Sequence, residues 1–210
     1  MSRISRGNLE YELDRASNAD LMQASALIAE SMLENPFNEW LFPEVASRRD
    51  RTSSYYNLLL RHHYIPNGIC EIIRHQSRVV GISVWHLPAK WKIPESTSSA
   101  ILEEVRDLFD SNLFEVGRGI REIESKHPQF PHLYAGLTVV APEMQGTGLG
   151  SILYGTLLTY ADEHNLPIYL ELTRERDQSW IKGLGFEVTG EIDIADGPTL
   201  WTCLRLPTPS

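Results

Sequence analysis

The sequence predicts one mixed α/β domain with a mostly antiparallel, twisted sheet and helices on both of its faces. Three observations lead to this prediction. Strand-like and helix-like patterns alternate along all 210 residues, without an internal repeat or a low-complexity run. Two strand-like regions are typical of antiparallel pairs, one near residues 69–88 and one near the C-terminus. A hydrophobic content of 42% is sufficient for one well-buried core.

The N-terminal half is predicted to contain three strands and two helices. Asn18 and Asp20 provide helix-start chemistry before an apolar spacing of three and four residues. Gln76 and Ser77 mark the turn of a hairpin. The expected elements, in order, are a strand over 9–14, a helix over 21–33, a turn-rich segment over 36–43, a helix over 47–63 and a hairpin over 69–88.

The C-terminal half is predicted to alternate strands and helices after a long loop. Pro88, Pro94 and several Ser and Thr residues indicate a loop over 88–99, and Gly117 is expected to divide the helical pattern of 100–126. The further elements expected, in order, are a strand over 132–140, a helix over 148–165, a strand over 167–173, a short helix over 177–184 and an antiparallel pair over 186–194 and 199–206.

The composition narrows the classes of partner. A formal net charge of −9 does not suit a nucleic-acid-binding surface and fits a cationic partner better. Cys70 and Cys203 lie far apart in apolar contexts, so both are predicted to be reduced core residues, and no metal site is expected. The sequence shows neither a signal peptide nor an apolar run of eighteen residues. We therefore expect a cytoplasmic protein that does not span a membrane, with its oligomeric state open.

Three glycines in five positions stand out in PEMQGTGLGSILYG, residues 142–155. Gly146, Gly148 and Gly150 follow a predicted strand and open a predicted helix. The first turn of a helix has free backbone N–H groups and about half a positive charge, and glycines let an anion approach closely. The stretch is therefore predicted to bind a phosphate group. The alternative is a turn that only permits tight packing between helix and strand.

Two common phosphate-binding motifs do not fit this stretch. The P-loop has Lys followed by Ser or Thr after its last glycine, whereas Ser151 and Ile152 follow Gly150 here. The dinucleotide fingerprint G-x-G-x-x-G is not matched, and it belongs after the first strand of a parallel sheet. Another phosphate ligand, such as a nucleotide, stays a weaker alternative.

The stretch from Gln145 to Gly150 resembles the Q/R-x-x-G-x-G/A pyrophosphate loop of the GNAT acetyltransferase superfamily. The segments HLYAGLTVVAPEMQGTGLGS, LPIYLELT and IKGLGFEVTGEIDIADGPTLWTCLRLP look like the C-terminal half of the puromycin N-acetyltransferase branch. PFNEWLFP and VWHLP resemble its N-terminal half more loosely. The resemblance implies one GNAT-like domain over residues 1–210, with residues 88–128 as a loop-helical insertion.

The resemblance also implies acetyl-CoA as a cosubstrate, without a metal. The backbone of Thr138, Val139 and Val140 would pair with the pantetheine arm, and an amide near Val140 would help to hold the developing oxyanion. The acetyl group would pass directly to the primary amine of a small molecule, with no nucleic acid or membrane as partner. The residues implied to hold the pyrophosphate are Gln145, Gly146, Thr147, Gly148, Leu149, Gly150 and Ser151.

Glu171 is the candidate general base for this transfer. An amine with a pKa near 10 must lose a proton before it attacks. Along PIYLELT the strand period puts Tyr169, Glu171 and Thr173 on one face, where Glu171 would accept the proton directly or through a water. The alternative is a carboxylate that pairs with Arg174 or Arg176.

Tyr134, on the strand that carries Thr138, is the second candidate catalytic residue; its alternative role is in the core. The sequence departs from the family pattern in RERDQSWIKGLGF. Ile181 stands where GNAT relatives have a tyrosine that protonates the departing thiolate, and Arg174 stands where they have an asparagine. Water or Tyr154 is the alternative proton donor. The departure leaves a second function open, that of a non-catalytic acyl-CoA-binding protein.

Several other side chains have both a functional and a structural interpretation. His62 and His63 point about 100° apart on a helix and are expected at the surface. The run from Arg48 to Arg51 is expected to be a solvated helix face. The candidates for an apolar wall of the acceptor site, each with a core role as the alternative, are Phe37, Trp40, Trp85 and Trp180.

Overall fold

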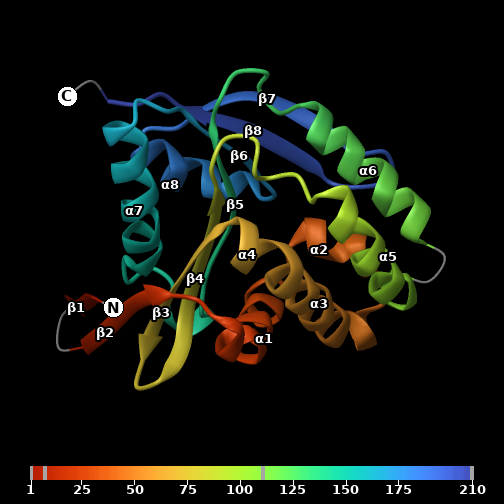
Figure 1. The fold of residues 1–210 in the computed structure, drawn as a ribbon, viewed down its shortest axis with the longest axis horizontal. Helices are drawn as coiled ribbons and strands as arrows, with labels where there is room; N and C mark the ends of the chain where they lie inside the picture. The colour runs from red at the N-terminus through yellow and green to blue at the C-terminus, as the bar shows by residue number, and fades with distance from the viewer. Residues whose placement is uncertain (1, 7–8, 110–111, 209–210) are drawn as a thin grey trace.

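The structure, a computed structural model, describes residues 2–6, 9–109 and 112–208 (Figure 1). Eight strands form one sheet in the order β1-β2-β3-β4-β5-β6-β8-β7. Neighbouring strands are antiparallel except β5 and β6, which are parallel, so the predicted mixed and mostly antiparallel sheet is confirmed. The strands are β1 (Ser2–Arg6), β2 (Leu9–Arg15), β3 (Ile69–His75), β4 (Arg78–His86), β5 (Leu133–Val140), β6 (Ile168–Leu172), β7 (Glu187–Asp193) and β8 (Thr199–Arg205).

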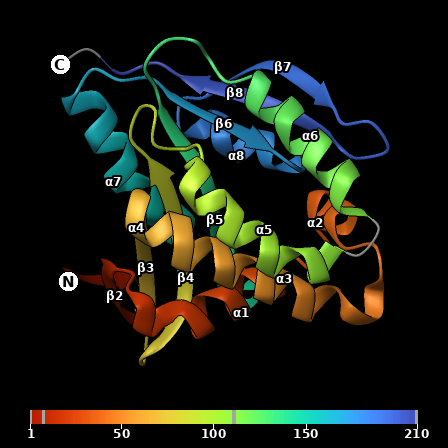
Figure 2. The same ribbon diagram turned by 45° about the vertical axis from the view of Figure 1, so that its right-hand side comes forward.

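Helices cover both faces of the sheet (Figures 1 and 2). Leu153 of α7 packs against Gly81 of β4, and buried residues of α1, α3 and α7 join β3 and β4 in one apolar cluster. Both views place α7 apart from α1 and α3, with the strands between them. The helices are α1 (Leu21–Ser31), α2 (Pro36–Leu41), α3 (Val45–Leu59), α4 (Ile65–Asn67), α5 (Glu95–Phe109), α6 (Leu113–Ser125), α7 (Leu149–Glu163) and α8 (Gln178–Gly183).

The predicted order of elements needs correction at three places. β1 is a strand that the sequence pattern did not reveal, because it is polar and pairs with β2 at an edge of the sheet. The segment over 36–43 forms helix α2 rather than turns, since Asn35 accepts a hydrogen bond from Phe37 N (3.0 Å) and Pro36 occupies the first helical turn. α5 begins at Glu95, within the expected loop.

Gly117 does not divide the two helices that follow this loop. It lies inside α6, which begins at Leu113, whereas α5 ends at Phe109. The second glycine of α6, Gly119, explains why the helix contains this residue type: a Cβ there would lie 2.6 Å from a ring carbon of Trp40. Glycine in α6 thus permits a close helix–aromatic contact.

Arg48 is buried rather than solvated. Its guanidinium donates to the carbonyl oxygens of Phe42 (2.8 Å) and Pro43 (3.0 Å), which follow α2, and pairs with Glu39 (3.0 Å). The free carbonyl groups at the C-terminal end of a helix attract a cation, so this arginine closes α2. Arg51 also contacts protein, donating to the carbonyl of Leu108 at 2.8 Å.

The predicted hairpin turn and the two predicted core cysteines are confirmed. Gln76 (φ 49°) and Ser77 (φ 67°) form the left-handed turn between β3 and β4. Cys70 and Cys203 are buried and unpaired within the described part of the chain. Across the described ranges, no helix is both long and apolar enough to span a membrane.

The sheet opens between β5 and β6. Their pairing is limited to Leu133 with Ile168 and Tyr134 with Tyr169, although β5 continues to Val140. β4 stays paired along β5, with an irregularity opposite Gly136. The far edge of β5 beyond Tyr134 therefore faces a gap in the sheet.

Candidate active site

A cavity of about 720 Å³ occupies this gap and extends across the sheet towards α6. One end is formed by β5 and the glycine stretch before α7. The other end is formed by histidine and aromatic side chains around Glu171. The candidate cofactor residues and the candidate catalytic residues thus line one continuous space.

The glycine stretch has the left-handed backbone that its composition predicts. Gly146 (φ 75°) and Gly148 (φ 88°) lie in the region that disfavours side chains, and α7 begins directly afterwards at Leu149. A Cβ on Gly146 would meet no described atom within 4 Å. The stretch therefore leaves open space in front of a helix N-terminus, which suits an anion.

A cation from the N-terminal strand lies against this loop. A Cβ placed on Gly148 would lie 3.4 Å from Cζ of Arg6, the last residue of β1. The sequence reasoning missed this residue because it missed the strand. On the other side, a Cβ on Gly150 would lie 3.2 Å from the ring of Trp180.

Most of the predicted cofactor residues line the cavity, and Thr147 is the exception. Its hydroxyl donates to the carbonyl of Met144 (2.6 Å), so it stabilises the turn instead. Gln145 lines the cavity and also donates to the carbonyl of Val140 (3.2 Å). The predicted residues among the lining are Thr138, Val139, Val140, Gln145, Gly146, Gly148, Leu149, Gly150 and Ser151.

Backbone groups of β5 point into the gap. Ala141 donates to the carbonyl of Val80 (2.9 Å), and antiparallel pairing then alternates along the strand. In this alternation Val139 bonds to β4, whereas the N–H groups of Thr138 and Val140 point to the opposite edge. An extended ligand in the gap can therefore hydrogen-bond to β5 as an additional strand would.

Glu171 and Tyr134 come together at the other end of the cavity. The carboxyl group of Glu171 is buried, and burial raises its pKa to about 7, although the hydroxyls of Tyr134 and Tyr169 act in the opposite direction. No arginine neutralises it among the described ion pairs, since Arg174 pairs with Asp177 at 3.2 Å. The described ion pairs therefore give no support to the alternative role of Glu171 as an arginine partner.

The described partner of Glu171 is a histidine. Nε2 of His127 lies 3.4 Å from Oε1 of Glu171, and Nδ1 of His127 lies 3.2 Å from Nε2 of His132. Nδ1 of His132 lies 2.9 Å from the carbonyl oxygen of Phe130. Burial lowers the pKa of His127 to about 3 and also lowers that of His132, so both rings are neutral.

This chain of contacts fixes the tautomers. A carbonyl only accepts, so Nδ1 of His132 carries the proton and its Nε2 must accept from Nδ1 of His127. Nε2 of His127 is then an acceptor that faces Glu171. The contact is a hydrogen bond only when Glu171 itself is protonated, and this agrees with its raised pKa.

Two further buried histidines line the cavity, His63 and His86. Their rings stack with centroids 5.0 Å apart, and burial lowers the pKa of His86 to about 3. The prediction of His63 at the surface is wrong, because residues 60–64 form a π-helical turn that rotates its side chain inward. His86 had a signal in the sequence: it ends β4 opposite Tyr134.

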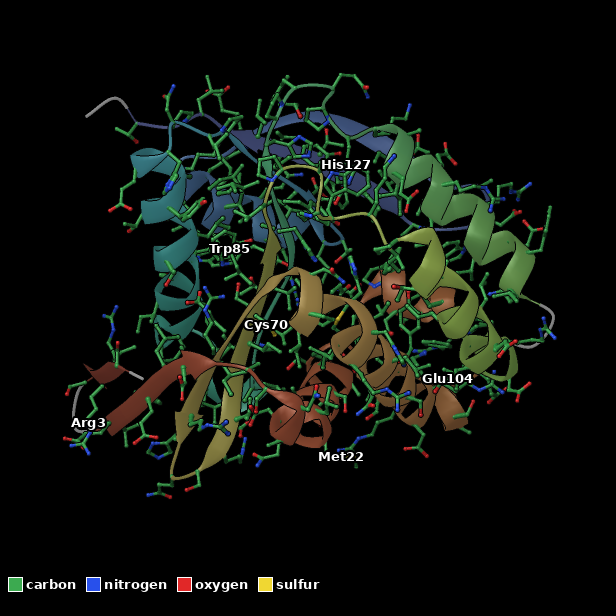
Figure 3. The ribbon with its side chains drawn as sticks, viewed as in Figure 1. Arg3, Met22, Cys70, Trp85, Glu104 and His127 are labelled. Atoms are coloured by element: carbon green, nitrogen blue, oxygen red, sulfur yellow. The ribbon has the colours of Figure 1, made fainter. Side chains whose placement is uncertain are left out.

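The aromatic candidates separate into two groups. Phe37 and Trp180 line the cavity, whereas Trp40 does not and Trp85 is fully buried against Tyr160 of α7. Figure 3 shows Trp85 beside α7. It shows His127 further towards α6. An aromatic that the sequence reasoning missed, Trp91, stacks on His127 with centroids 3.6 Å apart.

Ile181 does not face the cavity. It is the buried residue of α8, packs into the core and is absent from the described lining residues. Tyr154 of α7 does line the cavity, and its hydroxyl contacts the side chain of Thr138. Burial raises the pKa of Tyr154, so the phenol keeps its proton at neutral pH.

Comparison with known proteins agrees with this geometry. Residues 116–186 match the model of the acetyltransferase (GNAT) family. The fold resembles that of a histone acetyltransferase HPA2 and related acetyltransferase from Corynebacterium glutamicum, with 22% identity, 95% of this chain and 98% of that one covered, and a TM-score of 0.71. It also resembles arylalkylamine N-acetyltransferase 2 from Aedes aegypti (12% identity, 96% and 100% covered, TM-score 0.62). A third similar structure is the polyamine N-acetyltransferase of Drosophila melanogaster (16%, 93% and 99%, 0.60).

These similarities extend over nearly the whole chain. The single-domain α/β architecture is therefore a GNAT fold, as the sequence predicted. The match over residues 116–186 includes most of α6, β5, the glycine stretch, α7, β6 and α8, and each of these contributes residues to the cavity lining. Residues 116–186 thus match the acetyltransferase (GNAT) family, and the chain as a whole has the fold of these solved structures.

Proposed function

We propose that this protein is an N-acetyltransferase that uses acetyl-CoA and transfers the acetyl group directly to the primary amine of a small molecule. One observation carries the proposal: a continuous cavity joins a left-handed glycine stretch, the open edge of β5 and the buried carboxyl group of Glu171. Two similar structures have the names of enzymes that act on amines, which supports an amine acceptor.

The residues at the first end suit a long ligand with phosphates. Arg6 and the N–H groups at the start of α7 would hold the pyrophosphate, and the N–H groups of Thr138 and Val140 would bond the amides of the pantetheine arm. Acetyl-CoA, when bound, supplies an electrophilic thioester carbonyl. The same edge of β5 would stabilise negative charge on the carbonyl oxygen.

Glu171 would act as the general base. Its pKa of about 7 lies near physiological pH, so it can take a proton from the amine and release it again. Tyr134 and Tyr169 flank its carboxyl group and would orient it. Tyr154 would donate a proton to the departing thiolate, in the role that Ile181 cannot fill.

A second candidate function is acyl-CoA binding without catalysis. The observation that favours it is that position 181, where GNAT relatives have the tyrosine acid, is a buried isoleucine. A thiol with an ordinary pKa near 8.5 is a good leaving group, about 2 kcal/mol from ionisation at pH 7. The loss of this acid is therefore compatible with turnover, and we favour the enzyme.

Two measurements test the proposal. Acetyl-CoA and CoA should raise the melting temperature, because a ligand at 100 times its Kd adds about 2.7 kcal/mol to the free energy of unfolding. ATP and NADH should not raise it. Release of CoA with a broad panel of amines then tests catalysis. Binding without release with any amine would favour the second function, and stabilisation by none of the four ligands would overturn both.

A further inference from the structure

The end of the cavity around Glu171 has a chemistry that selects the acceptor. On the basis of the proposed function, we infer that the acceptor is an aromatic primary amine with a single positive charge, and that diamines and polyamines are poor substrates. The inference depends on which ring faces, ring edges and charges line this end.

The aromatic and imidazole rings at this end of the cavity stack on one another, face to face. His86, Tyr134 and Tyr169 stand side by side on β4, β5 and β6, with near-parallel planes and centroids 6.2 and 6.4 Å apart. His63 stacks on the outer side of His86. Side chains stand roughly perpendicular to a sheet, so His86 and Tyr134, the members of this row that line the cavity, present ring edges to it.

Trp91 does not offer a free face either. His127 covers one face at a centroid distance of 3.6 Å, and Nζ of Lys92 lies 5.0 Å from the centroid of the same ring. A cation is bound by the faces of aromatic rings, where the π electrons are concentrated. Ring edges are positive and pack against the face of another aromatic ring. The site therefore suits an aromatic ring rather than a chain of ammonium groups.

The charges lead to the same conclusion. Burial lowers the pKa of His63, His86 and His127, so these rings are neutral and do not accept a proton readily. They therefore provide no negative charge for an ammonium group. Glu171 is the buried carboxyl group at this end, and Asp177 is held by Arg174. A second carboxylate, Glu124 of α6, lines the cavity in a half-exposed position, and Lys92 adds a positive charge nearby.

Some buried polar atoms at this end lack a hydrogen-bond partner among the described residues. Both ring nitrogens of His86 and the Nδ1 atom of His63 have no hydrogen-bond partner among the described residues, although the two side chains are about 99% buried. A neutral imidazole offers one donor and one acceptor. Polar substituents on an aromatic acceptor would satisfy these atoms, whereas a methylene chain would not.

The test is a comparison of kcat/KM between matched amines with acetyl-CoA in excess. The probes are 2-phenylethylamine, its saturated analogue 2-cyclohexylethylamine, pentylamine, 1,4-diaminobutane and spermidine. We expect 2-phenylethylamine to exceed the saturated analogue at least 5-fold and 1,4-diaminobutane at least 100-fold. A higher value for 1,4-diaminobutane or spermidine than for 2-phenylethylamine would overturn the inference. So would equal values for the ring and its saturated analogue.

Matched variants strengthen the test. Ile120 lines the cavity on α6, and Ile120→Glu adds a carboxylate where Ile120→Gln adds only polarity. The first variant should raise kcat/KM for 1,4-diaminobutane at least 10-fold over the second, with no such gain for 2-phenylethylamine. If Glu124 already selects diamines, Glu124→Gln would remove diamine activity selectively, which contradicts the inference. Binding of acetyl-CoA without acetylation of any amine would instead contradict the proposed function.

Discussion

His127 and Glu171 face each other inside the cavity, with Nε2 of the imidazole 3.4 Å from Oε1 of the carboxyl group and both side chains buried. The tautomer of His127 is fixed by its contact with His132, which in turn donates to the carbonyl oxygen of Phe130. His127 therefore stabilises the protonated form of Glu171, and it does so without carrying a charge. This contact favours the same protonation state of Glu171 as burial does.

Replacement of His127 should change the pH dependence of the reaction. In the wild type, kcat/KM should rise with pH through about 7, because Glu171 must lose its proton before it can accept one from the amine. In His127→Gln the side-chain amide can donate to the carboxylate, which favours the charged form and moves this limb to lower pH. pH–rate profiles of both proteins measure the shift. A limb that stays near pH 7 in the variant would show that His127 does not control Glu171.

Removal of the carboxyl group should abolish most of the activity. We expect Glu171→Gln to lower kcat/KM by about 10² to 10⁴, with the affinity for acetyl-CoA unchanged, since the group acts on the amine. Glu71→Gln is the matched control. Glu71 is also a buried strand carboxyl with a pKa raised by burial, but it lies outside the described lining of the cavity. Equal losses in the two variants would indicate damage to the core instead of a catalytic role.

The same group should make stability depend on pH. Burial raises the pKa of Glu171 from 4.5 to about 7, so the folded chain binds this proton more tightly than the unfolded chain. Its contribution to stability is complete below about pH 4.5 and is lost as the pH rises through about 7. Gln does not titrate, so Glu171→Gln should gain melting temperature relative to the wild type between pH 5 and pH 8. Parallel melting curves at the two pH values test this, and a constant difference would contradict it.

Arg6 should contribute to acetyl-CoA binding. Its guanidinium lies beside Gly148, where the proposed pyrophosphate site begins. Arg6→Ala should weaken binding several-fold, by about 1 kcal/mol, and the difference should shrink at high salt. Arg3→Ala is the control, because residues 3 and 6 of a strand lie on opposite faces. Figure 3 shows Arg3 at the outer edge of the molecule. Titration calorimetry at two salt concentrations would detect the difference, and identical affinities for the two variants would exclude the contact.

Tyr154 should affect turnover more than substrate binding. Tyr154→Phe removes the hydroxyl that contacts Thr138 and keeps the ring that packs against Trp180. We expect kcat to fall about 10- to 100-fold with a smaller change in KM, since a thiolate leaves well without full protonation. A thioester donor with a more acidic thiol should reduce the deficit of the variant. An undiminished deficit with that donor would show that Tyr154 does not protonate the leaving group.

The sequence predicted the end of the cavity that is local in the chain. Residues 138–151 run along β5, through the glycine stretch and into α7, so their order already specifies their geometry. Glycine is the residue that allows a left-handed backbone, and Gly146 and Gly148 use it. The period of two residues in a strand also placed Glu171 correctly on the same face as Tyr169, because this period depends only on the local sequence.

The other end was predicted poorly because it is assembled from distant segments. His63, His86, Trp91 and His127 come from a helix end, a strand end and two loops. Each residue alone is typical of an ordinary core or surface position, and only tertiary packing brings them together. For His63 the helical period was itself misleading, since a π-helical turn adds about one residue to the repeat and turns the side chain from solvent to the cavity.

The opening between β5 and β6 places a strand edge inside the sheet. Two paired positions join the strands from β1 to β5 with β6, β8 and β7, and Tyr134 and Tyr169 form the last of them. An open strand edge at the margin of a sheet can pair with any extended chain, including another protein. The open edge of β5 instead lies between two parts of one sheet that share a buried core, so its backbone groups are available only to a segment narrow enough to enter the gap. The fold thus keeps an adhesive edge for a ligand while protecting it from aggregation.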